Sequence, residues 1–257
     1  MWIDRHNVRC AVVQSTAQER AWLDSFLRFR AKSGVGASKE QKLYHPGEGR
    51  APPSFPAGLL SLVEKGAPAK GYEVLVNDRR VRPCEPDEGA DLAWLLPHQL
   101  AGVEACVAAT RGIVKVATSG GKGELAVALG KKLPCRWLFG AHRFALIDDI
   151  ARRWDARGDG SRAGRLGGGV WDEGDGRFIG ATAQTLAPRI RDRDPATLAL
   201  LSQVDGVIWD EIHTAAGDQV RAVFNACPRA YWRFGLSGTP LNRSDMRSIL
   251  SVASTEQ

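Results

Sequence analysis

A glycine-rich stretch at 117–123, which reads Ala-Thr-Ser-Gly-Gly-Lys-Gly, has the composition of a loop that binds phosphate. It follows a short β-prone run that begins at Gly112, and a helix-prone run follows it. Glycines let backbone N–H groups turn toward an anion, and the amino end of a helix adds partial positive charge. We therefore expect a phosphate site in this loop, with Lys122 contacting the terminal phosphates.

The loop departs from the usual phosphate-binding pattern at two positions. Gly123 directly follows the lysine, where the pattern has a serine or threonine whose hydroxyl binds magnesium. Ser119 stands where glycine is more common. The sequence therefore predicts phosphate binding by the loop, without direct metal ligation from position 123.

Two adjacent carboxylates follow the apolar run 207–209. Asp210 and Glu211 begin the sequence Asp-Glu-Ile-His, which ends at His213. Carboxylates at the end of a buried strand are costly unless they hold a cation or a water molecule. They are candidates for magnesium binding and water activation, and an exposed acidic turn is the alternative.

A second polar motif, Leu-Ser-Gly-Thr-Pro at 236–240, follows another β-prone run. Ser237 and Thr239 place short hydroxyl groups just beyond a strand end, beside the predicted crevice. Serine, glycine and proline also favour ordinary turns, so the motif alone does not establish a site.

The elements that must position these residues alternate between strand and helix from Asp91 onward. Such alternation predicts a mostly parallel sheet covered by helices on both faces. The expected strands are 112–117, 136–140, 177–182, 206–209 and 231–237. The expected helices are 96–110, 122–132, 143–154, 184–190, 195–203 and 216–226. The glycine-rich stretch 156–176 is expected to form a hairpin or an exposed loop.

Residues 1–85 are predicted to form a separate small α/β domain, joined by a linker at 86–90 to a large domain at 91–257. The expected strands of the small domain are 8–14 and 72–77, and the expected helices are 16–30 and 57–65. A basic cluster contains Arg79, Arg80 and Arg82. It is predicted either to contact nucleic acid or to be a solvated strand end.

The composition limits the class of protein. The 257 residues carry a formal charge of +6, which fits a polyanionic partner without requiring one. The five cysteines are scattered without a Cys-x-x-Cys pair, which indicates reduced thiols of a cytoplasmic protein. No long apolar segment or signal peptide is present in the sequence, so a soluble protein without a membrane partner is expected.

Four motifs together resemble the superfamily 2 helicases of the DEAD/DEAH-box type. They are the phosphate loop, Asp-Glu-Ile-His, Leu-Ser-Gly-Thr-Pro and a Leu-Pro-His-Gln motif at 96–99. Their order and spacing match the first RecA-like lobe, a P-loop domain, and are most similar to the phage and XPB-like repair helicase group. The resemblance covers about 91–250. The small domain resembles accessory domains of that group only loosely.

The resemblance implies ATP and Mg²⁺ as cofactors and DNA or RNA as the partner. Asp210 would hold magnesium, Glu211 would act as general base, and Gln99 would read the adenine edge. The implied ATP-binding residues are Gln99, Thr118, Ser119, Gly120, Gly121, Lys122 and Gly123. His213, Ser237 and Thr239 would couple the nucleotide state to nucleic acid. Nucleic-acid contacts would come from His142, Arg143, Thr182, Gln184 and Thr185, although ordinary loop polar groups explain those two stretches equally well.

The family completes its active site with a second RecA-like lobe, which supplies arginine fingers. The sequence ends at Gln257, soon after Pro240, so that lobe is expected in a longer protein or in a separate chain. We therefore predict the ATP-binding lobe of a DNA helicase or translocase, weak or inactive as an ATPase on its own. The alternatives are a non-hydrolysing nucleic-acid-binding adaptor and, less favoured, a small-molecule ATPase or kinase, which would leave the last two motifs unexplained.

Overall fold

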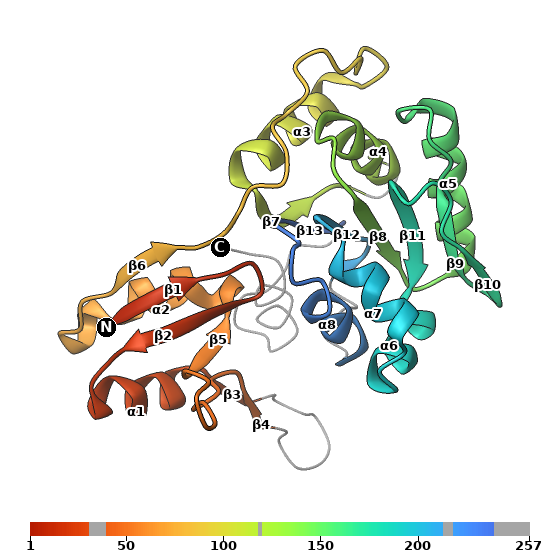
Figure 1. Ribbon diagram of the computed structural model, residues 1–257. Coiled ribbons are helices and arrows are strands. Elements are labelled where there is room, and N and C mark those ends of the chain that lie inside the picture. Colours follow the sequence, from red (N-terminus) through yellow and green to blue (C-terminus); the bar gives the residue numbers. More distant parts are fainter. Residues whose placement is uncertain (31–39, 118–119, 213–217, 239–257) are drawn as a thin grey trace.

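The computed structural model describes residues 1–30, 40–117, 120–212 and 218–238. Two units are visible, each with its own sheet (Figure 1). The smaller unit is formed by the amino-terminal part of the chain, and its last strand leads by an extended segment into helix α3 of the larger unit.

The larger unit is built on a seven-stranded sheet with the order β10-β9-β11-β8-β12-β13-β7. All neighbouring strands are parallel except β9 and β10, which form an antiparallel hairpin. The strands are β7 (Arg111–Lys115), β8 (Trp137–Ala141), β9 (Gly164–Gly167), β10 (Val170–Asp172), β11 (Phe178–Thr182), β12 (Gly206–Trp209) and β13 (Trp232–Ser237). The predicted mostly parallel sheet is confirmed, and the glycine-rich stretch contains the expected hairpin.

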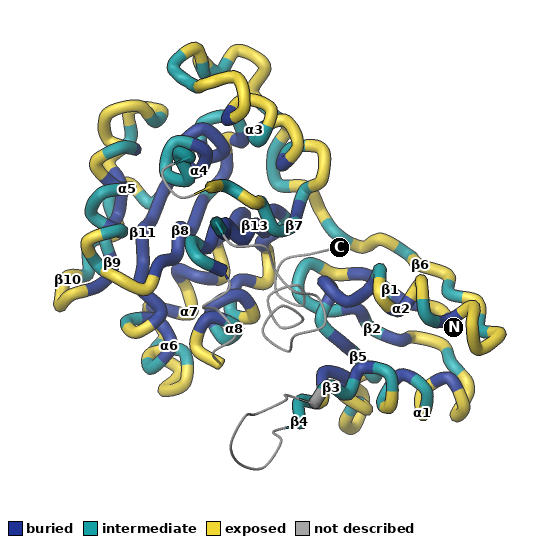
Figure 2. The backbone as a smooth tube through the Cα atoms, turned by 180° about the vertical axis from the view of Figure 1, so that it is seen from behind, coloured by how far each residue is buried: buried dark blue, intermediate teal, exposed yellow. Residues whose placement is uncertain are grey.

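Helices cover both faces of this sheet, as expected for parallel strands. One face is covered by α3 (Pro97–Ala109), α4 (Lys122–Lys132) and α5 (Phe144–Arg157). The other is covered by α6 (Ala183–Arg191), α7 (Pro195–Ser202) and α8 (Asp218–Asn225). The buried residues form two clusters, one on each side of the sheet. Figure 2 shows the strands between them as buried.

Successive side chains of a strand point to opposite faces of the sheet, so each strand contributes to both cores. In β8, Trp137 and Phe139 pack under α4 and α5, whereas Leu138 packs on the opposite face. The large indole rings need glycine on a neighbouring strand: a Cβ atom at Gly206 would lie 2.6 Å from the Trp137 ring. Glycine is used here for close packing, because a larger side chain would force the strands apart.

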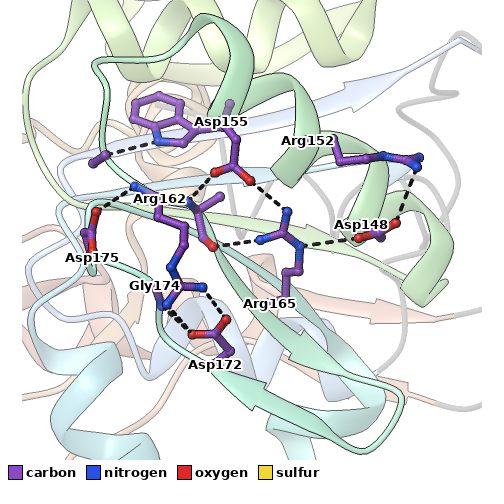
Figure 3. Close-up of polar contacts among 11 residues, drawn as sticks. Asp148, Arg152, Asp155, Arg162, Arg165, Asp172, Gly174 and Asp175 are labelled. Atoms are coloured by element: carbon purple, nitrogen blue, oxygen red, sulfur yellow. Dashed lines mark hydrogen bonds and ion pairs between the residues drawn. The ribbon is translucent and has the colours of Figure 1, made fainter.

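Helix α5 and the β9–β10 hairpin are tied together by ion pairs (Figure 3). Arg165 on β9 donates to Asp148 at 3.3 Å and to Asp155 at 2.8 Å, and both carboxylates belong to α5. Arg162 bonds with Asp172 on β10. Such networks add geometric specificity more than raw stability, so they fix how α5 lies against the sheet.

The smaller unit contains a four-stranded sheet with the order β5-β2-β1-β6. Its elements are β1 (Trp2–Arg5), β2 (Arg9–Gln14), α1 (Ala17–Phe26), β3 (Arg28–Arg30), β4 (Glu40–Lys42), β5 (Ser54–Pro56), η1 (Ala57–Leu59), α2 (Leu60–Gly66), η2 (Pro68–Lys70) and β6 (Leu75–Asp78). Thr16 and Glu19 form a capping box, which explains why α1 begins at Ala17.

Helix α1 is shorter than the predicted helix 16–30. It ends at Phe26, and the chain continues as β3, which pairs antiparallel with β4. Strands β1 and β5 were not predicted from the sequence. Strand β1 pairs with β6 and β5 pairs with β2, both distant in sequence, and local propensity does not reveal such pairing.

The two units meet at Arg80, Arg82 and Arg111. Together with Arg233, which lies opposite Arg111 on the neighbouring strand β13, we call these residues the arginine junction. The guanidinium of Arg80 lies 5.0 Å from the Tyr231 ring centroid, and that of Arg82 lies 5.3 Å from the Trp232 ring centroid. Arg111 donates to the carbonyl of Asn7 at 2.7 Å. The basic cluster at 79–82 therefore serves in part to hold the units together.

The segment between β6 and α3 follows the surface of the larger unit. The Asp87 amide donates to the Lys132 carbonyl at 2.7 Å, and Lys132 pairs with Glu88 at 2.8 Å. Cys84, Leu92 and Trp94 pack against the core beneath α3, α4 and α5. The domain division at 86–90 remains a proposal, since that segment is itself packed on α4. Among the described residues, no helix is long and apolar enough to cross a membrane.

Candidate functional site

Five strands of the parallel sheet bring the predicted motifs to one edge. The carboxyl ends of β7, β13, β12, β8 and β11 are neighbours in that order. They lead, respectively, into the phosphate loop, Ser237, Asp210, His142 and the stretch that begins at Thr182. Ligand sites of open α/β sheets lie at this edge.

Lys122 joins the phosphate loop to the carboxylates that follow β12. Its Nζ atom bonds with Glu211 Oε1 and lies 3.9 Å from Asp210 Oδ1. The Lys122 and Asp210 side chains are each 14% exposed, and that of Glu211 is 28% exposed. The structure therefore joins Lys122 in a salt bridge to carboxylates that lie almost ninety positions later in the sequence.

The turn after β12 fixes the two carboxylates. The Asp210 amide donates to the Gly140 carbonyl at 2.8 Å, and the Glu211 amide donates to Asp210 Oδ1 at 3.0 Å. Glu211 has a left-handed backbone with φ of 49°, which is unusual for a residue with a side chain. Burial raises the pKa of Asp210, while the Lys122 ammonium opposes this shift. Strain and perturbed ionisation at a sheet edge are typical of functional sites.

Gln99 lies between the start of α3 and the phosphate loop. Its side-chain oxygen accepts from the Leu96 amide at 3.0 Å, and its nitrogen donates to the Gly120 carbonyl at 3.3 Å. Gly121 has φ of 86°, and a Cβ atom there would overlap the Gln99 amide. Gln99 thus holds the loop, and its adenine-reading role stays a prediction.

A pocket of about 560 Å³ opens beside Lys122, and we call it the edge pocket. Its lining includes the start of α4, Asp210 and one side of α5. The sequence did not single out its residues Asp149 and Arg153, because charged residues of an amphipathic helix normally face solvent.

Glu124 also lines the edge pocket. Its Oε1 atom accepts from Arg153 at 2.6 Å and from Arg157 at 3.4 Å. Its Oε2 atom is buried and has no hydrogen-bond partner among the described residues. The arginines turn the carboxylate toward α5, so it is partly neutralised within the pocket.

The predicted nucleic-acid stretches after β8 and β11 lie next to each other. The Gln184 side-chain amide donates to the His142 carbonyl at 3.2 Å, and the hydroxyls of Thr182 and Thr185 lie 2.9 Å apart. His142 and Arg143 are exposed. Both residues directly follow β8, so they are accessible at the carboxyl edge of the sheet.

Four predicted site residues lie outside the described part of the chain: Thr118, Ser119, His213 and Thr239. Ser237 is described and buried, and its carbonyl accepts from the Val116 amide at 2.9 Å. That bond joins the end of β13 to the start of the phosphate loop. Ser237 is therefore connected directly to the segment that leads into the phosphate loop.

The donor groups of the edge pocket fit Mg²⁺ held chiefly by a nucleotide. Among the described residues, no group of three or more histidine, cysteine, aspartate or glutamate side chains could hold a metal ion alone. Magnesium is commonly bound by one or two carboxylates together with substrate phosphates and water. Asp210 is the residue placed to supply such a carboxylate.

Comparison with known proteins supports this interpretation of the fold. Residues 94–242 match the family model described as type III restriction enzyme, res subunit. No curated protein matches the chain.

Solved structures of helicases are similar in fold. A crystal structure of the UvsW helicase from bacteriophage T4 matches with a TM-score of 0.77 at 18% identity, covering 100% of this chain and 98% of that chain. A second T4 UvsW structure matches with a TM-score of 0.73 at 17% identity, covering 98% of this chain and 56% of that chain.

The helicase domain of Pyrococcus furiosus Hef matches with a TM-score of 0.51 at 19% identity, covering 64% of this chain and 38% of that chain. The family match spans more than half of the 257 residues and includes every motif at the sheet edge. The chain therefore belongs to the type III restriction enzyme res-subunit family, and its larger unit is a RecA-like lobe of the superfamily 2 helicase type.

Proposed function

We propose that this chain is the ATP-binding lobe of an ATP-dependent DNA helicase or translocase. The observation that carries the proposal is the contact of Lys122 with Glu211 and its approach to Asp210 at the mouth of the edge pocket. A lysine on a glycine-rich loop, facing two carboxylates at the end of a parallel strand, is the arrangement that phosphoryl-transfer sites use. Family membership supports the same class of activity.

The residues of the site would act by exchanging partners. Lys122 would leave the carboxylates and contact the terminal phosphates, and the loop amides would bind the remaining phosphate oxygens. Asp210 would then be free to hold Mg²⁺. The charge of the metal would neutralise the negative charge that develops on the phosphate oxygens. Glu211 would orient and deprotonate the attacking water. The salt bridge thus keeps the catalytic groups close together before nucleotide binds.

Nucleic acid would bind along the same edge of the sheet. The exposed residues His142 and Arg143 and the adjoining α6 start support this placement. One lobe offers few phosphate contacts, so we propose that a second RecA-like lobe completes both the track and the active site. Arginine fingers supply roughly 10³–10⁵ in rate in related sites, so the chain alone would be a poor ATPase.

A non-hydrolysing nucleic-acid-binding adaptor is the second candidate. It is favoured by Gly123, which gives the first turn of α4 no hydroxyl to hold magnesium. The same lobe would then bind nucleotide, or nucleic acid alone, without turnover. This alternative requires the carboxylates after β12 to be structural remnants.

ATP turnover with and without nucleic acid tests the proposal. The parent chain and Glu211→Gln would be assayed alone and after addition of a cognate second lobe. We expect slow turnover that nucleic acid and the second lobe both increase, and none with Glu211→Gln. ATP binding by the parent with no turnover under any of these conditions would favour the adaptor.

A further inference from the structure

We propose that Arg153 is a phosphate-binding residue of the edge pocket, and that it takes the room which Gly123 leaves beside Lys122. This inference rests on the proposed function, because it assumes a nucleoside triphosphate in the edge pocket. It goes further by assigning a charged ligand from α5 within the same lobe. Three observations support it: the space at Gly123, the orientation of Arg153 and the remaining donors of its guanidinium.

The first observation is that Gly123 leaves space beside Arg153, while its backbone conformation does not call for glycine. It lies inside α4 and is not among the glycines with left-handed φ. A Cβ atom at this position would lie 3.2 Å from Arg153 Cδ and 3.4 Å from Arg153 Nε. The absent side chain therefore makes room for the arginine.

The second observation is that two carboxylates orient Arg153. Its Nε atom donates to Asp149 at 2.8 Å, one turn earlier on α5, and its Nη1 atom donates to Glu124 at 2.6 Å. Helix α5 is in turn fixed by the ion pairs with the β9–β10 hairpin shown in Figure 3. The guanidinium is thus held against the first turn of α4, within the lining of the edge pocket.

The third observation concerns the donors that remain. Neither of the hydrogen bonds of Arg153 within the described residues uses Nη2, and the side chain is 40% exposed. A guanidinium matches the oxygens of a phosphate in a two-pronged geometry. Arg153 and Lys122 therefore share one pattern, since each is a pocket cation paired with carboxylates that phosphate oxygens can replace.

Glycine at position 123, in place of the usual serine or threonine, changes how the site neutralises the charge of its ligand. A serine or threonine after the lysine acts through magnesium, whereas Arg153 brings positive charge without a metal. The terminal phosphates of a nucleoside triphosphate would then be contacted by Lys122 from one side and Arg153 from the other. Affinity for the nucleotide should consequently depend less on magnesium than in a loop with the hydroxyl.

The test is ATP affinity, measured by calorimetry with and without Mg²⁺, for Arg153→Gln and a matched control, Arg152→Gln. Arg152 lies next in the chain, is 66% exposed and pairs only with Asp148 and Asp149 among the described residues, so it loses the same charge outside the pocket. We expect Arg153→Gln to weaken metal-free ATP binding about tenfold and Arg152→Gln to leave it within twofold. Adenosine binding should not change in either variant.

A double variant that removes the charge at position 153 and adds a hydroxyl at position 123 sharpens the test. Gly123→Ser combined with Arg153→Gln should restore ATP affinity only when Mg²⁺ is present. Arg153→Lys, which keeps the charge, should lose less affinity than Arg153→Gln. Melting temperatures would be recorded for every variant, and affinity losses that merely follow the loss of folded protein would overturn the proposal.

Lys122→Ala separates this inference from the proposed function. If Lys122→Ala weakens ATP binding while Arg153→Gln matches Arg152→Gln, the role of Arg153 is refuted and the nucleotide site stands. If Lys122→Ala also binds ATP like the parent, the nucleotide site itself is refuted.

Discussion

The edge pocket and the arginine junction both bury cationic side chains, but they satisfy them differently. In the pocket, Lys122 and Arg153 pair with carboxylates that remain partly exposed. At the junction, Arg233 is buried and donates to three backbone carbonyls, of Phe224, Cys227 and Ala230. Lys122 and Arg153 can exchange their carboxylate partners for phosphate, whereas the backbone carbonyls that hold Arg233 are fixed in the core. The partners of Lys122 and Arg153 thus distinguish these cations of the pocket from the buried Arg233.

The electrostatics of the junction support this distinction. Burial lowers the pKa of Arg233 to about 10 and lowers the pKa of Arg111 well below its usual value. The charges of Arg233, Arg80 and Arg5 add to the shift at Arg111. Like charges gathered together are costly, and here the cost is offset in two ways. Arg80 pairs with Asp78 and Arg82 with Glu85, whereas Arg111 and Arg233 donate to backbone carbonyls.

The largest expected effect is on stability at the junction. Arg233→Ala would leave three buried carbonyls without this donor and open a cavity beside Phe224. The Phe224 and Cys227 carbonyls would keep the Cys227 and Ala230 amides as donors, so the Ala230 carbonyl is the acceptor left unsatisfied. Hydrogen bonds to a charged group contribute about 1.5–3 kcal/mol, and with the cavity added we expect a loss of about 3 kcal/mol in the free energy of unfolding. Urea denaturation measures this, with Arg152→Ala as an exposed control. A loss below about 1 kcal/mol, the size expected for a single ordinary hydrogen bond, would show that the junction is not a clamp.

A second prediction gives the opposite pattern for the pocket. Lys122→Ala should weaken ATP binding more than tenfold, which is more than about 1.4 kcal/mol, because the terminal phosphates lose their main cation. The free energy of unfolding should change little, since the side chain pairs with partly exposed carboxylates. Glu211→Gln should keep ATP binding. Titration with ATP and urea denaturation of the same samples separate the two effects.

Much of the larger unit was predictable because its signals are local. The bounds of α4 at Lys122 and Lys132 follow from the glycine-rich start and the lysine-rich end. The approach of Lys122 to Asp210 follows from a general property of parallel strands, whose carboxyl ends lie at one edge of the sheet. In the smaller unit, β1 pairs with β6 and β5 pairs with β2, and these partners are distant in sequence, so no local pattern predicts the two strands.

The same reasoning explains which site residues the sequence did not indicate. Arg153 and Asp149 lie on a helix whose charges look like an ordinary solvated face, and only the packing of α4 against α5 brings them to the pocket. A glycine after the loop lysine was the available signal, because it left space that some other side chain had to fill. Likewise Arg80 and Arg82 look like exposed charges until Tyr231 and Trp232 are placed beneath them.

A third prediction concerns nucleic acid, and it compares one arginine from each region. Arg143 is exposed at the sheet edge, whereas Arg82 stacks on Trp232 at the junction. Arg143→Gln should weaken DNA binding and reduce the slope of log affinity against log salt by about 0.7–0.9, the value for one phosphate contact. Arg82→Gln should leave that slope unchanged. Equal slopes for the two variants would place the nucleic-acid track elsewhere.

The smallest expected effect comes from the ionisation of Asp210. Burial is the first cause of its raised pKa, so the folded protein binds a proton at this site more readily than the unfolded chain does. Stability contributed by the site therefore falls as pH rises from the unfolded value of this carboxyl through the folded pKa. Asp210→Asn removes the charge while keeping a similar shape. We expect it to raise the melting temperature slightly at neutral pH.

That gain should shrink as the pH is lowered toward the ordinary range of aspartate, because Asp210 itself then becomes neutral. Melting curves of the parent and Asp210→Asn across this pH range measure the effect. Lys122→Ala provides a sharper test, because removing the opposing ammonium should raise the pKa of Asp210 further. The pH range over which the melting temperatures differ with pH should then become wider. A difference in melting temperature that is constant with pH would mean that Asp210 is as well solvated in the folded protein as in the unfolded chain. The edge pocket would then lack the low-dielectric character that separates it from an ordinary charged surface.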